Sequence, residues 1–115
     1  MTEKTVYGTG IDRRTIGNYF ERLVDLIFKI LPMREDGERS LPVYMKSLMC
    51  ELTGFSALFP AIEFDAGMLT IMAIIQFLIE EPTCDVPIVR REVFQAISIC
   101  NRLKERYGTE ARPWT

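Results

Sequence analysis

The distribution of apolar and polar side chains is most unusual between Gly67 and Ile79, where the chain reads GMLTIMAIIQFLI. The only polar side chains in this stretch are Thr70 and Gln76, which lie about 240° apart around a helix and so form no polar stripe. Asp65, just before the stretch, is suited to cap its N-terminus. A helix that is apolar all round must be covered on every side. We therefore expect the fold to be organised around this helix.

Three other segments have helical periodicity. The first, residues 13–31, is strongly amphipathic. Asp12 is placed to cap its N-terminus, and Pro32 is expected to stop it. The second begins at Ser40 and is expected to end at Gly54, because glycine favours the left-handed conformation that closes many helices. In the third segment, residues 86–107, apolar side chains recur alternately three and four positions apart, which is the heptad spacing of packed helices. The pattern predicts an all-α fold, a compact bundle of four main helices at about 13–31, 41–53, 66–80 and 86–107.

The remaining segments are a connection and the two termini. Residues 1–11 have no helical period, and we expect a flexible N-terminal arm there. A single helical domain over 12–108 and a C-terminal tail over 109–115 would follow. The connection FSALFPAIEF is too apolar for a solvent loop, so we expect a short helical or turn segment at 55–63. This segment either packs across the bundle or contributes to a binding surface.

Composition adds limits to this picture. A chain of 115 residues, 48% apolar and 26% charged, has the size and balance of one globular domain. The net charge of −2 and the pI near 5.2 predict no overall attraction to nucleic acid or anionic lipid. The apolar helix is shorter than the roughly 20 residues that span a bilayer, and the N-terminus lacks a signal-peptide core. We expect a cytoplasmic protein with no membrane partner.

Candidate chemistry is sparse. The chain has no histidine, which removes the commonest general base and metal ligand, and it has no phosphate loop, dinucleotide fingerprint or paired-cysteine zinc pattern. Its three cysteines are expected to be reduced core thiols, with a redox pair or a reactive thiol as the alternative. We expect no catalytic residue, no cofactor and no metal site. The alternative from this class is a small carboxylate-based or metal-dependent enzyme, which would use Glu63, Asp65, Glu80 and Glu81.

Two arginine pairs are the candidates for contacts with phosphate or an acidic partner. Arg13 and Arg14 open the first helix, and Arg90 and Arg91 lie near the start of the last one. A nucleic-acid-binding regulator with an arginine-rich helix face is therefore an alternative function. Glu92 interrupts this face, and no base-stacking or groove-reading motif accompanies it.

The helix that is apolar all round favours a non-enzymatic protein–protein interaction module, such as an adaptor, assembly factor, regulator or inhibitor of a larger complex. The expected partner is a protein, most simply a second copy of the chain in a homodimer. Small helical chains of this kind are common among accessory proteins of mobile genetic elements, an association that rests on no motif. The candidate partner-binding residues are Phe55, Phe59, Met72, Ile75 and Trp114.

Overall fold

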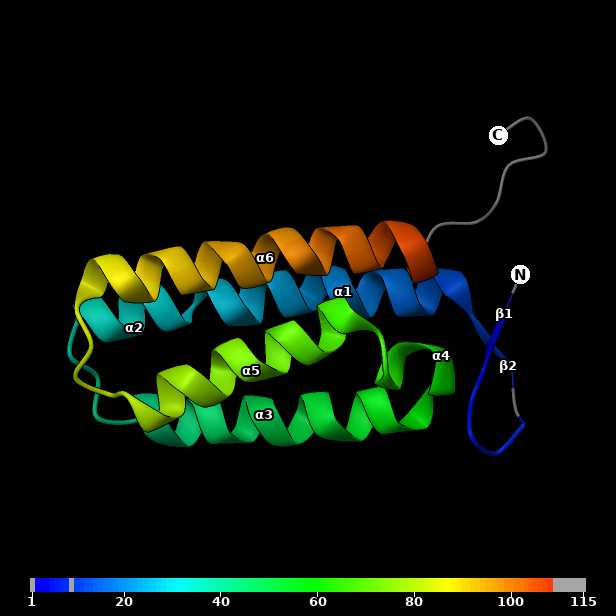
Figure 1. The fold of residues 1–115 in the computed structure, drawn as a ribbon, viewed down its shortest axis with the longest axis horizontal. Coiled ribbons are helices and arrows are strands. Elements are labelled where there is room, and N and C mark those ends of the chain that lie inside the picture. The colour runs from blue at the N-terminus through cyan, green and yellow to red at the C-terminus, as the bar shows by residue number, and fades with distance from the viewer. Residues whose placement is uncertain (1, 9, 109–115) are drawn as a thin grey trace.

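The protein is a helical bundle, and the predicted all-α fold with four main helices is confirmed (Figure 1). The computed structural model describes residues 2–8 and 10–108. No helix in this part of the chain combines the length and the apolar character needed to cross a bilayer. The elements in chain order are β1 (Thr2–Lys4), β2 (Gly10–Asp12), α1 (Arg13–Phe28), α2 (Ile30–Glu35), α3 (Leu41–Leu58), α4 (Pro60–Glu63), α5 (Ala66–Glu80) and α6 (Val86–Gly108).

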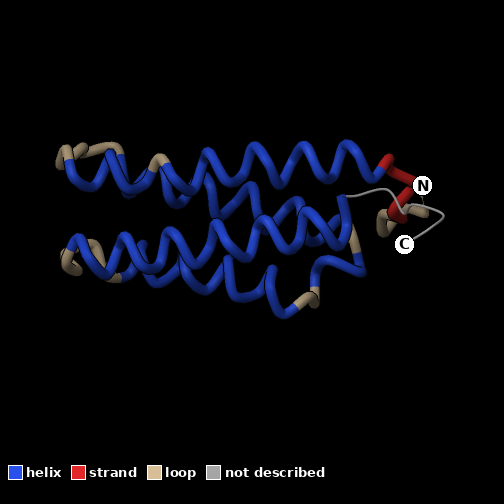
Figure 2. Tube along the Cα trace, turned by 90° about the horizontal axis from the view of Figure 1, so that it is seen from above, coloured by secondary structure: helices blue, strands red, loops and turns tan. Residues whose placement is uncertain are grey.

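The four long helices surround one core. Helices α1 and α6 lie side by side along the bundle, α3 lies on the opposite side, and α5 crosses between α6 and α3 (Figure 1). Viewed from above, the two strands lie beyond one end of the bundle, and the loops that join α2 to α3 and α5 to α6 lie at the other (Figure 2). Each long helix therefore has neighbours on its inner side and a second side turned away from the core.

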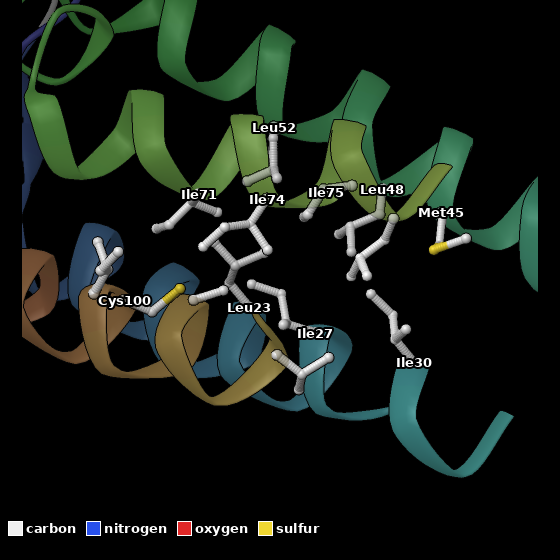
Figure 3. Close-up of a cluster of buried hydrophobic side chains, with 14 of the residues drawn as sticks. Leu23, Ile27, Ile30, Met45, Leu48, Leu52, Ile71, Ile74, Ile75 and Cys100 are labelled. Atoms are coloured by element: carbon white, nitrogen blue, oxygen red, sulfur yellow. The ribbon is translucent and has the colours of Figure 1, made fainter. Parts of the chain in front are cut away.

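The core is built from the apolar stripes of all four long helices. Helix α5 contributes Ile71, Ile74 and Ile75, whose side chains are almost completely covered because they face α1, α3 and α6 together (Figure 3). The residues drawn around them come from each neighbouring helix: Leu23 and Ile27 from α1, Leu48 and Leu52 from α3, and Cys100 from α6.

Helices α1 and α6 approach most closely where α1 begins and α6 ends. A Cβ atom added to Gly17 would lie 2.8 Å from the carbonyl oxygen of Gly108, so only glycine fits there. Beside this contact, the Arg13 guanidinium donates hydrogen bonds to the carbonyl groups of Arg106 and Tyr107. These are orphan carbonyls of the last turn of α6, and Arg13 therefore caps that helix.

Both predicted aspartate caps are confirmed. Asp12 accepts a hydrogen bond from the Arg14 N–H at 2.9 Å, and Asp65 accepts one from the Gly67 N–H at 2.8 Å. Each carboxylate thereby satisfies a backbone donor that has no partner inside its helix.

The predicted stop at Pro32 is wrong. Helix α1 ends earlier, at Phe28, and Pro32 is the third residue of a new helix, α2. The first turn of a helix has no intrahelical acceptor for its N–H groups, so a proline there costs no hydrogen bond.

The predicted end of α3 at Gly54 is also wrong. Gly54 does not have a positive φ angle, and α3 continues through it to Leu58. Phe59 then takes an extended conformation, as expected for the residue before Pro60, and α4 follows. The predicted short helical segment is thus present, but it is limited to the four residues Pro60–Glu63.

The N-terminal segment, expected to be a flexible arm, forms a β-hairpin in which Glu3 pairs with Ile11. The Val6 N–H donates to the Leu58 carbonyl at 2.8 Å, which ties the hairpin to the end of α3. Strands of three residues are too short to show an alternating pattern in the sequence. The predicted tail, residues 109–115, lies outside the described residues.

Candidate interaction surface

Helix α5 has two apolar faces with different surroundings. The side chains of Met68, Ile71 and Ile75 are fully covered by the rest of the chain. On the opposite side, Leu69 is 50% exposed and Phe77 is 37% exposed, and Ala73 between them is also exposed. These three residues are spaced at i, i+4 and i+8, so they form one ridge along the helix. We call Leu69, Ala73 and Phe77 the outer face of α5.

A groove runs beside this face, between α5 and α3. It has a volume of about 660 Å³ and is lined by Lys46, Met49, Cys50, Thr53, Gly54, Gln76 and Ile79. Met49 and Ile79 are half-buried and form its apolar part, while Gly54 leaves open space above α3. The outer face of α5 and this groove together form a surface on which a partner would contact apolar side chains from two helices.

The predicted partner residues are divided by the structure. Ile75 is fully covered and Phe59 is 2% exposed, so neither presents a surface to a partner. Phe55 is half-buried and stacks on Tyr19 with 3.8 Å between ring centroids. Met72 is half-buried on the α3 side of α5, next to the outer face. Trp114 lies outside the described residues.

Two of the three phenylalanines of the segment 55–64 pack inside the bundle, Phe55 in the last turn of α3 and Phe59 directly after it, whereas Phe64 is 76% exposed. Phe55 also meets Phe20 edge to face at 5.6 Å and Phe59 at 5.2 Å between centroids. Such arrangements stabilise a core beyond the area that they bury. Of the two expectations for this segment, the contacts of Phe55 and Phe59 support packing across the bundle.

The two arginine pairs do not form one patch. Arg13 is engaged with the end of α6, and Arg14 is exposed beside it. Arg90 lies near the other end of α6, 3.9 Å from Glu35, and Arg91 pairs with the adjacent Glu92 at 3.2 Å. Because α1 and α6 are antiparallel, the pairs lie at opposite ends of the bundle, about 24 Å apart at 1.5 Å per helical residue.

A polar network that the sequence analysis did not predict closes one end of the bundle. The Asp65 carboxylate, whose side chain is only 6% exposed, lies 2.6 Å from an Arg106 nitrogen and 2.6 Å from the Tyr107 hydroxyl. Burial by itself would raise the pKa of Asp65, but the hydrogen bonds from Tyr107, the Gly67 N–H and Arg106 hold that pKa below its ordinary value. The carboxylate is therefore ionised at neutral pH and joins α5 to α6.

The other end of the bundle contains a cavity of about 190 Å³. Its lining is mainly apolar but includes Arg34, whose Nη2 atom donates to the Cys84 carbonyl at 2.9 Å. The Arg34 Nε atom is buried and has no hydrogen-bond partner among the described residues. Glu38 and Glu81 also line the cavity, so its lining carries charges of both signs and favours neither an anionic nor a cationic small ligand.

The cysteines and carboxylates are dispersed. Burial raises the pKa of the Cys100 thiol to about 12, whereas Cys50 is exposed and Cys84 is half-buried. All three are free thiols. Within residues 2–8 and 10–108, no three cysteine or carboxylate side chains come together in a group that could hold a metal ion.

Comparisons with known proteins give no assignment: no protein-family model, no curated protein and no solved structure matches this chain. The candidate site therefore rests on geometry. Leu69 and Phe77 were missed in the sequence because every side of α5 is apolar, and the residue types alone do not distinguish the side that faces the core.

Proposed function

We propose that the chain is a non-enzymatic protein–protein interaction module, that its binding surface is the outer face of α5, and that its partner is a second copy of the same chain. The observation that carries this proposal is the exposure of Leu69 and Phe77 on a helix whose opposite face is the core. Ala73 continues the apolar ridge between them. No charged side chain interrupts this ridge from Leu69 to Phe77.

The energetics favour covering this face. Moving a fully exposed leucine or phenylalanine side chain out of water is worth roughly 1.5–3 kcal/mol, and a partner would gain part of this at each of the two positions. The half-buried Met72 and Ile79 would add apolar area on the α3 side. Methionine suits such a surface because its unbranched side chain repacks easily against a partner. Two copies that cover the same face would each gain this burial.

The experiment is light scattering coupled to size-exclusion chromatography, over a concentration series. The test variant carries Leu69→Glu and Phe77→Glu, which place two carboxylates on the outer face. The matched control is Phe94→Glu on α6. Phe94 is 48% exposed, which is close to the 50% of Leu69, but its ring lies beside Phe28 of α1 and outside the outer face of α5. Circular dichroism checks that each variant keeps its helical content.

We expect the wild type and the Phe94→Glu control to form a dimer as concentration rises, and the double variant to stay a folded monomer. A wild type that is monomeric at every concentration would contradict the proposed self-association. A double variant that dimerises as well as the control would contradict the assignment of the surface.

A further inference from the structure

The residues of α5 are arranged symmetrically about its midpoint, which bears on how a second copy would dock if the proposed self-association holds. The helix comprises the 15 residues Ala66–Glu80, and Ala73 lies seven residues from each end. Leu69 precedes Ala73 by four residues, and Phe77 follows it by four. Each of these side chains is therefore about 6 Å along the helix axis from Ala73, on opposite sides of it.

We infer that the two copies pair through antiparallel α5 helices, with a two-fold axis beside Ala73. A two-fold interface is self-complementary, so a residue four positions before the axis meets the partner's residue four positions after it. Leu69 then packs against the partner's Phe77, and Phe77 against the partner's Leu69. The two large exposed side chains of α5 thus cover each other in both copies.

The residue at the axis is suited to the crossing point. The distance between two packed helices depends on the side chains at their contact, and small residues allow the shortest distances. Ala73 is the smallest residue of the outer face and is exposed. A larger residue at the axis would meet its own copy and hold the leucine and phenylalanine pairs apart.

Charges at the two ends of α5 favour the same orientation. Glu80 is exposed at the C-terminus of the helix, where the helix dipole disfavours a carboxylate, and the Gln76 amide donates to it at 2.9 Å. No cation pairs with Glu80 among the described residues. Arg102 of α6 lies beside the first half of α5, where it lines a groove together with Gly67 and Thr70. Arg102 also has no ion-pair partner in the described part of the chain.

The antiparallel arrangement brings these two groups together. With the axis beside Ala73, Glu80 lies opposite the partner's Ala66, near the partner's Arg102 and at the positive end of the partner's α5 dipole. A parallel arrangement would instead place Glu80 next to the partner's Glu80, where like charges repel. The charge pattern therefore selects the antiparallel pairing.

Disulfide trapping tests the register. The background carries Cys50→Ser and Cys84→Ser, since Cys50 is exposed beside α5 and Cys84 is half-buried, while Cys100 is buried. A single Ala73→Cys substitution is oxidised with oxidised glutathione at a concentration where the background protein is dimeric. A disulfide requires Cα atoms within about 7 Å, so a cysteine at the axis should link to its own copy. Ser47→Cys, exposed on α3 and absent from the groove lining, measures the rate of random collision.

We expect Ala73→Cys to form the covalent dimer at least tenfold faster than Ser47→Cys. We also expect a mixture of Leu69→Cys and tagged Phe77→Cys chains to form the mixed dimer faster than either chain links to itself. If Leu69→Cys and Phe77→Cys each link to themselves and the mixture does not, the pairing is parallel and the inference is overturned. If a dimer forms in solution but Ala73→Cys links no faster than Ser47→Cys, the register is overturned while the proposed self-association stands.

A charge exchange gives an independent readout. Glu80→Arg and Arg102→Glu should each raise the dimer dissociation constant about threefold, as expected for exposed ion pairs. The two changes in one chain should return it to the wild-type value. Weakening that adds up in the double variant would show that the two residues do not meet, and would overturn the antiparallel pairing.

Discussion

The inner and outer faces of α5 are made of the same kinds of residue but lie in opposite environments. Ile71 and Ile75 are fully covered, whereas Leu69 and Phe77 on the other side are 50% and 37% exposed. The difference arises from the neighbours, because α1, α3 and α6 all lie on the inner side. Apolar character therefore identifies α5 as a helix that needs cover, and the bundle supplies that cover on one face only.

The position of α5 in the bundle explains why one face is left open. In a bundle of four long helices, each helix turns part of its surface away from the core. Helices α1 and α6 place mainly polar residues there, as the opposite stripes of their sequences predict. The exceptions are Phe28 and Phe94, which are 46% and 48% exposed and lie 6.2 Å apart between ring centroids. Helix α5 has leucine and phenylalanine at these positions. The outer face is thus one part of the bundle where the sequence provides more apolar surface than the fold covers, and it is a continuous ridge along a single helix.

The largest expected effect comes from truncating the same amount of side chain on the two faces. Ile75→Ala should lower the free energy of unfolding by about 3 kcal/mol, because it leaves a cavity in a close-packed core. Leu69→Ala should lower it by less than about 1 kcal/mol, since its site is half open to solvent. Urea unfolding, at a concentration where the protein is monomeric, measures both. Equal losses of unfolding free energy in the two variants would contradict the assignment of Ile75 to the core and Leu69 to the exposed face.

Asp65 gives the second prediction, because it fixes the start of α5. Asp65→Asn should lower the free energy of unfolding at pH 7 by about 1–2 kcal/mol, because the neutral amide loses the charge-assisted hydrogen bonds that Tyr107 and Arg106 donate to the carboxylate, while its oxygen can still accept from the Gly67 N–H. The pKa of Asp65 is lower in the folded chain, so its stabilisation is fully present above the unfolded value of about 4 and is lost as pH falls through the folded pKa. The stability difference between wild type and Asp65→Asn should therefore shrink on acidification. Urea unfolding between pH 7 and pH 3 tests this, and a difference that stays constant would contradict an ionised Asp65 as the source.

The smallest effect concerns Gly54, which lines the groove beside the outer face. An added Cβ would meet nothing within 4 Å, and Gly54 lies inside a helix. Gly54→Ala should therefore raise the free energy of unfolding by about 0.5–1 kcal/mol. Gly17→Ala is the matched control and should lower the stability, because its Cβ would lie 2.8 Å from the Gly108 oxygen. Thermal unfolding of both variants checks that their stability changes have opposite signs. A loss of stability in Gly54→Ala would contradict the open space above Gly54.

Short-range features of the fold could be predicted from the sequence. The caps at Asp12 and Asp65 depend on a carboxylate and an N–H two residues away, and both were found. The ends of α1 at Phe28 and of α3 at Leu58 could not be placed, because Pro32 and Gly54 are each compatible with more than one position in a helix. Proline is tolerated in a first turn, and an exposed glycine can continue a helix at modest cost. Only the tertiary contacts decide between these positions.

The candidate site was predicted only in part. The sequence identified α5 correctly as the unusual helix, but it placed the partner contact at Ile75, which the core covers. The network of Asp65, Arg106 and Tyr107 was missed because it joins residues more than 40 positions apart, and no local spacing marks such a pair. The orientation of α5 depends on how α3 and α6 pack against it. Hence a sequence that is apolar all round does not reveal which side faces outward.

The most direct test of the account is sedimentation equilibrium of the wild-type chain over a wide range of concentrations. The exposed outer face of α5 predicts a mass that rises from the 13.3 kDa of one chain toward twice that value. A mass that stays at 13.3 kDa at every concentration would contradict the claim that two copies cover this face.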